Sequence, residues 1–249
     1  MTSLDGAVAV ITGAGRGLGA ALAMTLADAG SQVILCGRNE AALRVIGETI
    51  KLRTGRASAA VVLDLADRLS IDTAVANITA AYPLIDILVN NAAAWLERSP
   101  DPHSAEEVLS VVTATVSGTF LLTQGLLPLL RKSACPDVVT IGSVNALPNA
   151  PLRTVSVPFY AAKHAQAALA EGLRQALAGT PVRSICIHPP DLDDVLPSDP
   201  EWEGVLGRKK GERGTSRDVV EAVMFALTRP RHITLSSIVL DADVGGLSG

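Results

Sequence analysis

The chain has 249 residues, of which 48% are hydrophobic and 18% are charged, and its formal net charge is −4. This size and composition suit one large domain with a sizeable core. The short basic patch at residues 208–210 is too small for a surface that binds nucleic acid or an anionic membrane. The start of the chain shows no charged and apolar leader, and no run of about 18 apolar residues follows. We therefore expect a cytoplasmic protein with a small-molecule ligand.

The cysteines and histidines give no sign of a metal centre. Cys36, Cys135 and Cys186 lie far apart, without the spacing of metal ligands or the even number of a disulfide framework. The four histidines are equally scattered. We expect reduced thiols and no bound metal.

Short apolar runs alternate with longer Ala- and Leu-rich stretches. The runs predict strands at 7–11, 32–36, 59–63, 85–89, 138–141, 182–187 and 238–240. The stretches predict helices at about 18–29, 39–54, 68–81, 104–131, 159–178 and 216–228. Strands that are apolar on both faces and joined by helices form a parallel sheet covered on both sides. The sequence therefore predicts an α/β fold: one domain over residues 1–249, with a Rossmann-type, doubly wound parallel sheet of about seven strands.

A glycine-rich turn, Thr-Gly-Ala-Gly-Arg-Gly-Leu-Gly at 12–19, joins the first predicted strand to the first helix. Its glycines allow a sharp turn and a close approach of backbone amides to a pyrophosphate at the positive end of the helix. An ordinary tight turn can have the same spacing, so both interpretations stay open. Ligands of such sheets bind beyond the carboxyl ends of the strands. That rim also carries Arg38, Asp64, Asn90, Ser143 and Pro189.

Residues 190–215 interrupt this regular pattern. The segment is rich in Pro, Asp and Gly and lacks helical or strand periodicity. The segment is long enough to form a lid over the cleft at the rim of the sheet, with a solvated loop as the alternative for its acidic run.

Further motifs follow the glycine turn in order. Asp64 precedes Leu65, Asn90-Asn91-Ala92-Ala93 ends the fourth strand, Ser143 follows the fifth, and Lys163 lies in the next helix, with Asp241 near the C-terminus. In their order and spacing these motifs resemble the short-chain dehydrogenase/reductases over nearly the whole chain. The resemblance implies a dinucleotide cofactor and a homodimer or homotetramer. It implies cofactor contacts at Gly13, Arg16, Gly17, Leu18, Gly19, Arg38, Asp64, Leu65, Asn91, Ala92, Lys163 and Pro189.

Two arginines bear on which dinucleotide is bound. Arg16 lies inside the glycine turn, and Arg38 follows the second strand, where an acidic residue would accept the ribose hydroxyls of NAD. Guanidinium groups suit the 2'-phosphate of NADP. We therefore predict NADP(H), with two solvated surface arginines as the alternative.

The catalytic positions depart from the family pattern. The resemblance implies a proton-donating Tyr four residues before the Lys, but Phe159 stands there and Tyr160 is next to it. A small shift at the start of the helix would bring the Tyr160 hydroxyl towards Lys163. Thr115 replaces an Asn that holds a relay water, and Pro190 and the acidic run 191–194 replace the usual Gly and Thr. The catalytic candidates are Ser143, Tyr160, Lys163, Phe159 and Thr115.

These departures leave three hypotheses for the function. The first is an NADP(H)-dependent reductase with an atypical site, acting on a C=O or C=N group of a small organic substrate; an iminium carbon accepts hydride without a proton donor. The second is non-redox chemistry, such as cyclisation or isomerisation, and the third is a non-catalytic partner of an active subunit. Substrate contacts are predicted at Trp95, Asp191, Asp194 and Trp202. Packing of the lid onto the body explains Trp202 equally well.

Overall fold

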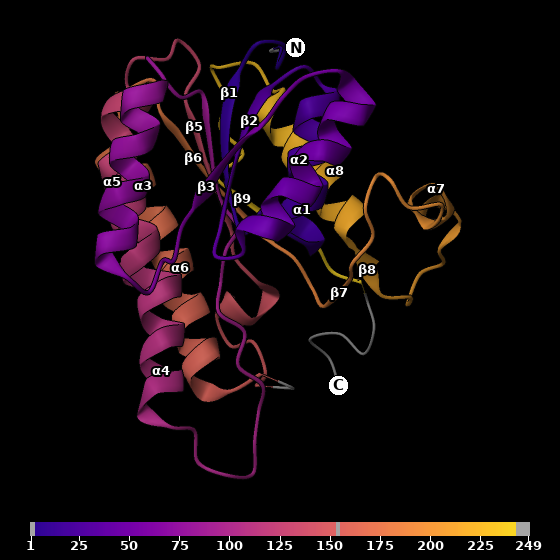
Figure 1. The fold of residues 1–249 in the computed structure, drawn as a ribbon. Coiled ribbons are helices and arrows are strands. Elements are labelled where there is room, and N and C mark those ends of the chain that lie inside the picture. Colours follow the sequence, from indigo (N-terminus) through magenta and orange to yellow (C-terminus); the bar gives the residue numbers. More distant parts are fainter. Residues whose placement is uncertain (1–2, 153–154, 243–249) are drawn as a thin grey trace.

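The computed structural model describes residues 3–152 and 155–242. Seven parallel strands form its main sheet, in the order β3-β2-β1-β4-β5-β6-β9 (Figure 1). The strands are β1 (Val8–Thr12), β2 (Gln32–Gly37), β3 (Ala59–Val62), β4 (Ile87–Asn90), β5 (Asp137–Ile141), β6 (Arg183–His188) and β9 (Ser237–Val239). The order reverses between β1 and β4, so a crevice opens where these strands end. The prediction of a doubly wound parallel sheet of seven strands is confirmed.

Helices cover both faces of the sheet (Figure 1). α1 (Gly17–Asp28), α2 (Glu40–Thr54) and α8 (Ser216–Leu227) pack together on one face. α3 (Arg68–Ala81), α4 (Ala105–Val112), α5 (Thr119–Leu130) and α6 (Val157–Ala176) cover the other. All six predicted helices are present, with ends that differ by at most two residues.

The strands have apolar side chains on both faces because each face of the sheet has its own core. In β1, Ala9 and Ile11 belong to the core under α1 and α8, whereas Val8 and Val10 belong to the core under α3 and α5. Successive side chains of a strand point to opposite faces, so both sets must be apolar. This two-sided burial explains why the predicted strands are uninterrupted apolar runs.

The predicted helix at 104–131 contains a π-helical turn, Thr113–Gly118, between α4 and α5. Gly118 lies so close to the Leu65 carbonyl that a β-carbon would overlap it. The whole stretch, Ala105–Leu130, is long and apolar enough to cross a membrane. Leu122, Leu126 and Leu130 are nevertheless fully buried beneath the sheet, so we interpret the stretch as a core helix.

Residues 190–215 form short elements beside α1 and α8 (Figure 1). They are β7 (Leu192–Asp193), α7 (Glu201–Gly204), a 3-10 turn (Val205–Gly207) and β8 (Gly214–Thr215), with β7 paired to β8. Within this fully described segment, Asp194 is the one residue that lines the cleft at the glycine turn. Most of the segment packs against the side of the domain, and its role as a lid stays a prediction.

Candidate functional site

The glycine turn has the geometry that its sequence predicts. Gly17 has a φ of +50°, a conformation that other residues rarely adopt. A β-carbon on Gly19 would overlap the Gly13 carbonyl and lie 2.6 Å from the Asn91 amide nitrogen. α1 therefore begins close against the ends of β1 and β4.

Thr12 joins these two strand ends. Its hydroxyl donates to the Val89 carbonyl at 3.2 Å and accepts from the backbone amides of Asn91 and Ala92, both at 3.0 Å. The Asn91 side chain donates to the Thr12 carbonyl at 2.9 Å. Sequence reasoning placed Thr12 in the turn but gave it no role. The signal was available, because a hydroxyl residue at the switch point can bridge the two strands.

A cleft of about 600 Å³ opens at this turn. Of the predicted cofactor contacts, it brings together Gly13, Arg16, Gly17, Leu18, Gly19, Arg38, Asp64, Leu65, Asn91 and Ala92. Lys163 and Pro189 are not in this lining. Sequence reasoning missed several others, among them Asn39, Ala42, Leu43, Leu63 and Ser110.

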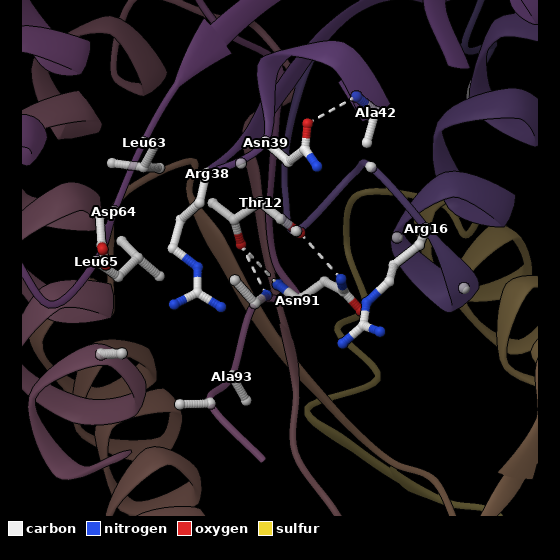
Figure 2. Close-up of a pocket in the computed structure, with 18 of the residues that line it drawn as sticks. Thr12, Arg16, Arg38, Asn39, Ala42, Leu63, Asp64, Leu65, Asn91 and Ala93 are labelled. Atoms are coloured by element: carbon white, nitrogen blue, oxygen red, sulfur yellow. Dashed lines mark hydrogen bonds between the residues drawn. The ribbon is translucent and has the colours of Figure 1, made fainter. Parts of the chain in front are cut away.

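Two guanidinium groups point into the cleft. Figure 2 shows the side chains of Arg38 and Arg16 extending from opposite sides towards its interior. Neither forms an ion pair or a side-chain hydrogen bond with another residue in the described part of the chain. Asp64 is held by its own loop, because its carboxylate accepts from the Ala66 amide at 2.9 Å. The cleft thus offers two free cations to an anionic ligand.

The N-terminal end of α1 also lacks a side-chain cap. Its N-cap residue is Arg16, which makes no side-chain cap hydrogen bond, and its first turn has no acidic residue. By contrast, Asn39, Asp67 and Ser156 cap α2, α3 and α6. The positive end of α1 is therefore open to an anion from outside the helix.

Ser143 lies at the end of β5 and is nearly buried. Its hydroxyl accepts from the Asn145 amide at 3.1 Å, as expected of a serine that caps a loop. Its carbonyl lies 3.0 Å from Nδ1 of His188, whose pKa is lowered chiefly by burial. Pro189 is also buried, and its carbonyl accepts from the Val144 amide. Ser143 and Pro189 thus meet through the loop after β5.

Lys163 points into the interior between α6 and β5. Its ammonium donates to the Ile141 carbonyl at 3.0 Å and to Oε1 of Gln166 at 2.9 Å. Burial lowers the pKa of Lys163 to about 8. Burial also raises the pKa of the nearby Cys186 thiol to about 11, in accord with a reduced core cysteine. Sequence reasoning missed Gln166, although a polar residue on the buried face of a helix is a usable signal.

Phe159 lies beside this lysine. Nζ of Lys163 is 5.9 Å from the centroid of the Phe159 ring. The edge of Trp95 packs on the same ring, with centroids 4.7 Å apart, while about half of Trp95 stays exposed. Tyr160 turns elsewhere: its hydroxyl donates to the Ala150 carbonyl at 2.8 Å. The structure therefore brings Phe159, and not the Tyr160 hydroxyl, next to Lys163.

Thr115 lies in the π-helical turn and is fully buried. Its hydroxyl is one of three buried side-chain groups without a hydrogen-bond partner among the described residues; the others belong to Asn90 and Gln166. Buried unpaired polar groups are costly. Functional sites often contain π-helical turns.

The four residues predicted to contact the substrate lie in different places in the structure. Trp95 lies beside Phe159, and Asp194 lines the cleft. Asp191 is exposed and does not line the cleft in the described part of the chain. Trp202 packs against the core near α1 and α8, with the Arg217 guanidinium 5.5 Å from its ring. The packing of this ring is the alternative that the sequence also allowed, and the substrate role of Trp202 stays a prediction.

Of the residues near the C-terminus, Asp241 belongs to the described part of the chain, whereas positions 243–249 lie outside it. Among the described residues, no group of His, Cys, Asp and Glu side chains has an arrangement that could hold a metal ion.

The sequence of the chain is related to those of known oxidoreductases. The family model of the short chain dehydrogenases matches residues 7–197. An uncharacterized oxidoreductase of Staphylococcus saprophyticus is 28% identical over 240 residues, which cover 96% of this chain and 99% of that protein.

Solved structures give the same result. A short chain dehydrogenase from Shigella flexneri, complexed with NADP, superposes with a TM-score of 0.81 at 26% identity and covers 96% of this chain and 99% of its own. One from Escherichia coli, complexed with NADPH, has a TM-score of 0.81 at 26% identity, with 97% and 98% covered. The chain belongs to the short-chain dehydrogenase family.

Proposed function

We propose that the protein is an NADP(H)-dependent oxidoreductase that reduces a C=O or C=N group of a small organic substrate. One observation carries the cofactor choice. The guanidinium groups of Arg16 and Arg38 point into the cleft beside the glycine turn and pair with no acidic residue in the described part of the chain. Free guanidinium groups are the natural partners of a 2'-phosphate. The NADP and NADPH complexes of the two related structures support this choice.

The residues of the cleft fit most of a dinucleotide. The uncapped start of α1 would hold the diphosphate, and the tight packing of Gly19 keeps the backbone of the turn close to that position. Arg16 and Arg38 would hold the 2'-phosphate, and Asp64 and Leu65 would lie along the adenine. When bound, NADPH supplies a hydride to an electrophilic carbon.

The proposed substrate group follows from the surroundings of Lys163. Reducing a ketone creates an alkoxide, which needs a proton from an acid in the site. Phe159 has no proton to give, and the Tyr160 hydroxyl is bonded to Ala150. An iminium ion already carries a positive charge, so addition of hydride to its carbon gives a neutral amine and needs no proton from the site. We therefore favour C=N over C=O.

Calorimetry with NADPH and NADH, followed by NADPH oxidation against ketones and cyclic imines, tests this function. We expect tighter binding of NADPH and turnover of imines but little turnover of ketones. Equal turnover of the two substrate classes would contradict the choice of C=N. An absence of nucleotide binding would contradict the function as a whole.

A second candidate is a homologue that binds the cofactor but performs non-redox chemistry or serves as the partner of an active subunit. The hydrogen bonds of Lys163 favour it, because they direct the ammonium to Ile141 and Gln166 in the interior. NADPH binding without oxidation of any imine or ketone would support this candidate over the first.

We also propose a homo-oligomer. Leu109, Phe120 and Leu121 are large apolar side chains of the continuous α4–α5 helix that remain 39–64% exposed. A second copy of the chain would cover them.

A further inference from the structure

The cleft contains one feature that does not fit a dinucleotide. The carboxylate of Asp194 lies against Gly17, with its oxygens 2.7 and 2.9 Å from the position that a β-carbon of Gly17 would take. Gly17 is the first residue of α1, so a negative charge already lies at the end of the helix that would receive the diphosphate.

The Asp194 carboxylate is unpaired within the described part of the chain. No described residue donates a hydrogen bond or offers a cation to its carboxylate. The position of this carboxylate is therefore not explained by an ion pair within the 190–215 segment. Its surroundings are the turn at Gly17 and the cleft itself.

The residues on either side hold Asp194 in place. Asp193 accepts from Arg208 at 2.9 Å and pairs with Arg213 at 3.3 Å, and it lies in β7, which is paired to β8. The buried Val195 donates its amide to the hydroxyl of Ser216 at 3.3 Å. Moving Asp194 away from Gly17 therefore means disturbing an anchored segment.

We propose that the Asp194 carboxylate competes with the cofactor diphosphate for the start of α1 and so determines how tightly the chain binds its dinucleotide. Two negative charges cannot share this position without a large electrostatic cost. Binding therefore proceeds against this repulsion or with displacement of Asp194. The inference rests on the proposed cofactor, and it concerns the affinity for the diphosphate and not for the 2'-phosphate.

Two ligands and two variants isolate the effect of the Asp194 charge on binding of the diphosphate. NADPH carries both the diphosphate and the 2'-phosphate, whereas adenosine 2'-phosphate has no diphosphate. Asp194→Asn removes the charge at Gly17 and keeps the shape of the side chain. Asp191→Asn removes the same charge three residues away, where the side chain is exposed and does not line the cleft.

We expect calorimetry to show a Kd for NADPH about tenfold lower in Asp194→Asn than in the wild type. The corresponding free energy is a modest share of the repulsion between two unit charges near a protein surface. The difference in Kd between Asp194→Asn and the wild type should become smaller at high salt. Adenosine 2'-phosphate should bind equally to both proteins, and Asp191→Asn should match the wild type.

Unchanged or weaker NADPH binding by Asp194→Asn, alongside normal binding of adenosine 2'-phosphate, would overturn the inference and leave the proposed cofactor intact. Equal tightening by Asp191→Asn would overturn it too, since net charge alone would then explain the gain. If neither ligand binds wild type or variants, the proposed function fails and this inference fails with it.

Discussion

The Lys163 ammonium lies 5.9 Å from the centre of the Phe159 ring, four residues before it on α6. Residues four apart in a helix lie on the same face, so the sequence spacing already predicts this pairing. The ring offers the ammonium a weak cation–π contact but no hydroxyl. The polar partners of Lys163 are therefore Ile141 and Gln166.

Phe159→Tyr should restore a proton donor at this position. The new phenol would lie beside a cation, which favours its ionised form and lets it exchange a proton with a substrate oxygen. We expect ketone reduction to rise by about 100-fold or more, the usual contribution of a general acid, with imine reduction much less affected. Steady-state oxidation of NADPH measures both.

Tyr160→Phe provides the comparison for that variant. It removes a hydroxyl that is bonded to Ala150, so turnover should stay as in the wild type. A large loss of ketone or imine turnover in Tyr160→Phe would instead identify Tyr160 as the displaced acid.

Arg38→Ala should reduce the preference for NADPH. Loss of a charge-assisted contact to the 2'-phosphate should weaken NADPH binding about 10- to 100-fold. NADH lacks that phosphate and should bind as before. Arg44→Ala is a matched control, because Arg44 is exposed on α2 and pairs with Glu40 outside the cleft lining. Equal weakening of NADPH and NADH in Arg38→Ala would contradict the proposed contact.

Phe120→Glu tests the proposed oligomer. A charge on an apolar surface that a second copy covers should shift the protein towards monomers. Light scattering after size-exclusion chromatography measures the mass. An unchanged mass in Phe120→Glu and in Leu109→Glu would place any interface elsewhere.

The fold could be predicted almost entirely from the sequence because strands that are buried on both faces are uninterrupted apolar runs. The run predicted at 32–36 is β2, Gln32–Gly37, in which Val33 and Leu35 belong to one core and Ile34 and Cys36 to the other. The π-helical turn at Thr113–Gly118 could not be predicted. It contains Gly118, which lies against Leu65, a contact between elements distant in the sequence.

The predicted cofactor contacts come together in one cleft, whereas the predicted substrate contacts do not. The positions of the glycine turn and Arg38 in the cleft follow from the local sequence and from the strand ends that they follow. Trp202 and Asp194 come from one irregular segment, and tertiary packing alone decides that Trp202 joins the core while Asp194 reaches Gly17. The carbonyl partner of Tyr160 likewise comes from the loop around Ala150, which has no periodic signal.

A buried ion cluster at the far end of the sheet predicts a large stability effect. Asp137 accepts from Arg183 through both oxygens, at 2.7 and 2.8 Å, and from Arg231 at 2.7 Å. Asp137→Asn leaves two guanidinium groups without a counter-charge, one of them buried, and should cost about 3–5 kcal/mol of unfolding free energy. Glu40→Gln in the exposed pair with Arg44 should cost less than about 1 kcal/mol. Urea denaturation compares the two; similar small losses would contradict the structural role of Asp137.

The buried ammonium of Lys163 predicts how stability changes at alkaline pH. Burial lowers its pKa from 10.5 to about 8. Between these values the unfolded chain binds a proton that the folded chain does not, so stability rises with pH across this window and is constant below it. The rise in the free energy of unfolding should reach at most about 3 kcal/mol.

Lys163→Met should abolish this rise. The raised pKa values of Cys36 and Cys186 act in the opposite direction, but both cysteines remain in the variant. The difference in unfolding free energy between the two proteins therefore isolates Lys163, and a difference that stays constant from about pH 7.5 to pH 10.5 would show that the ammonium is not held in the interior.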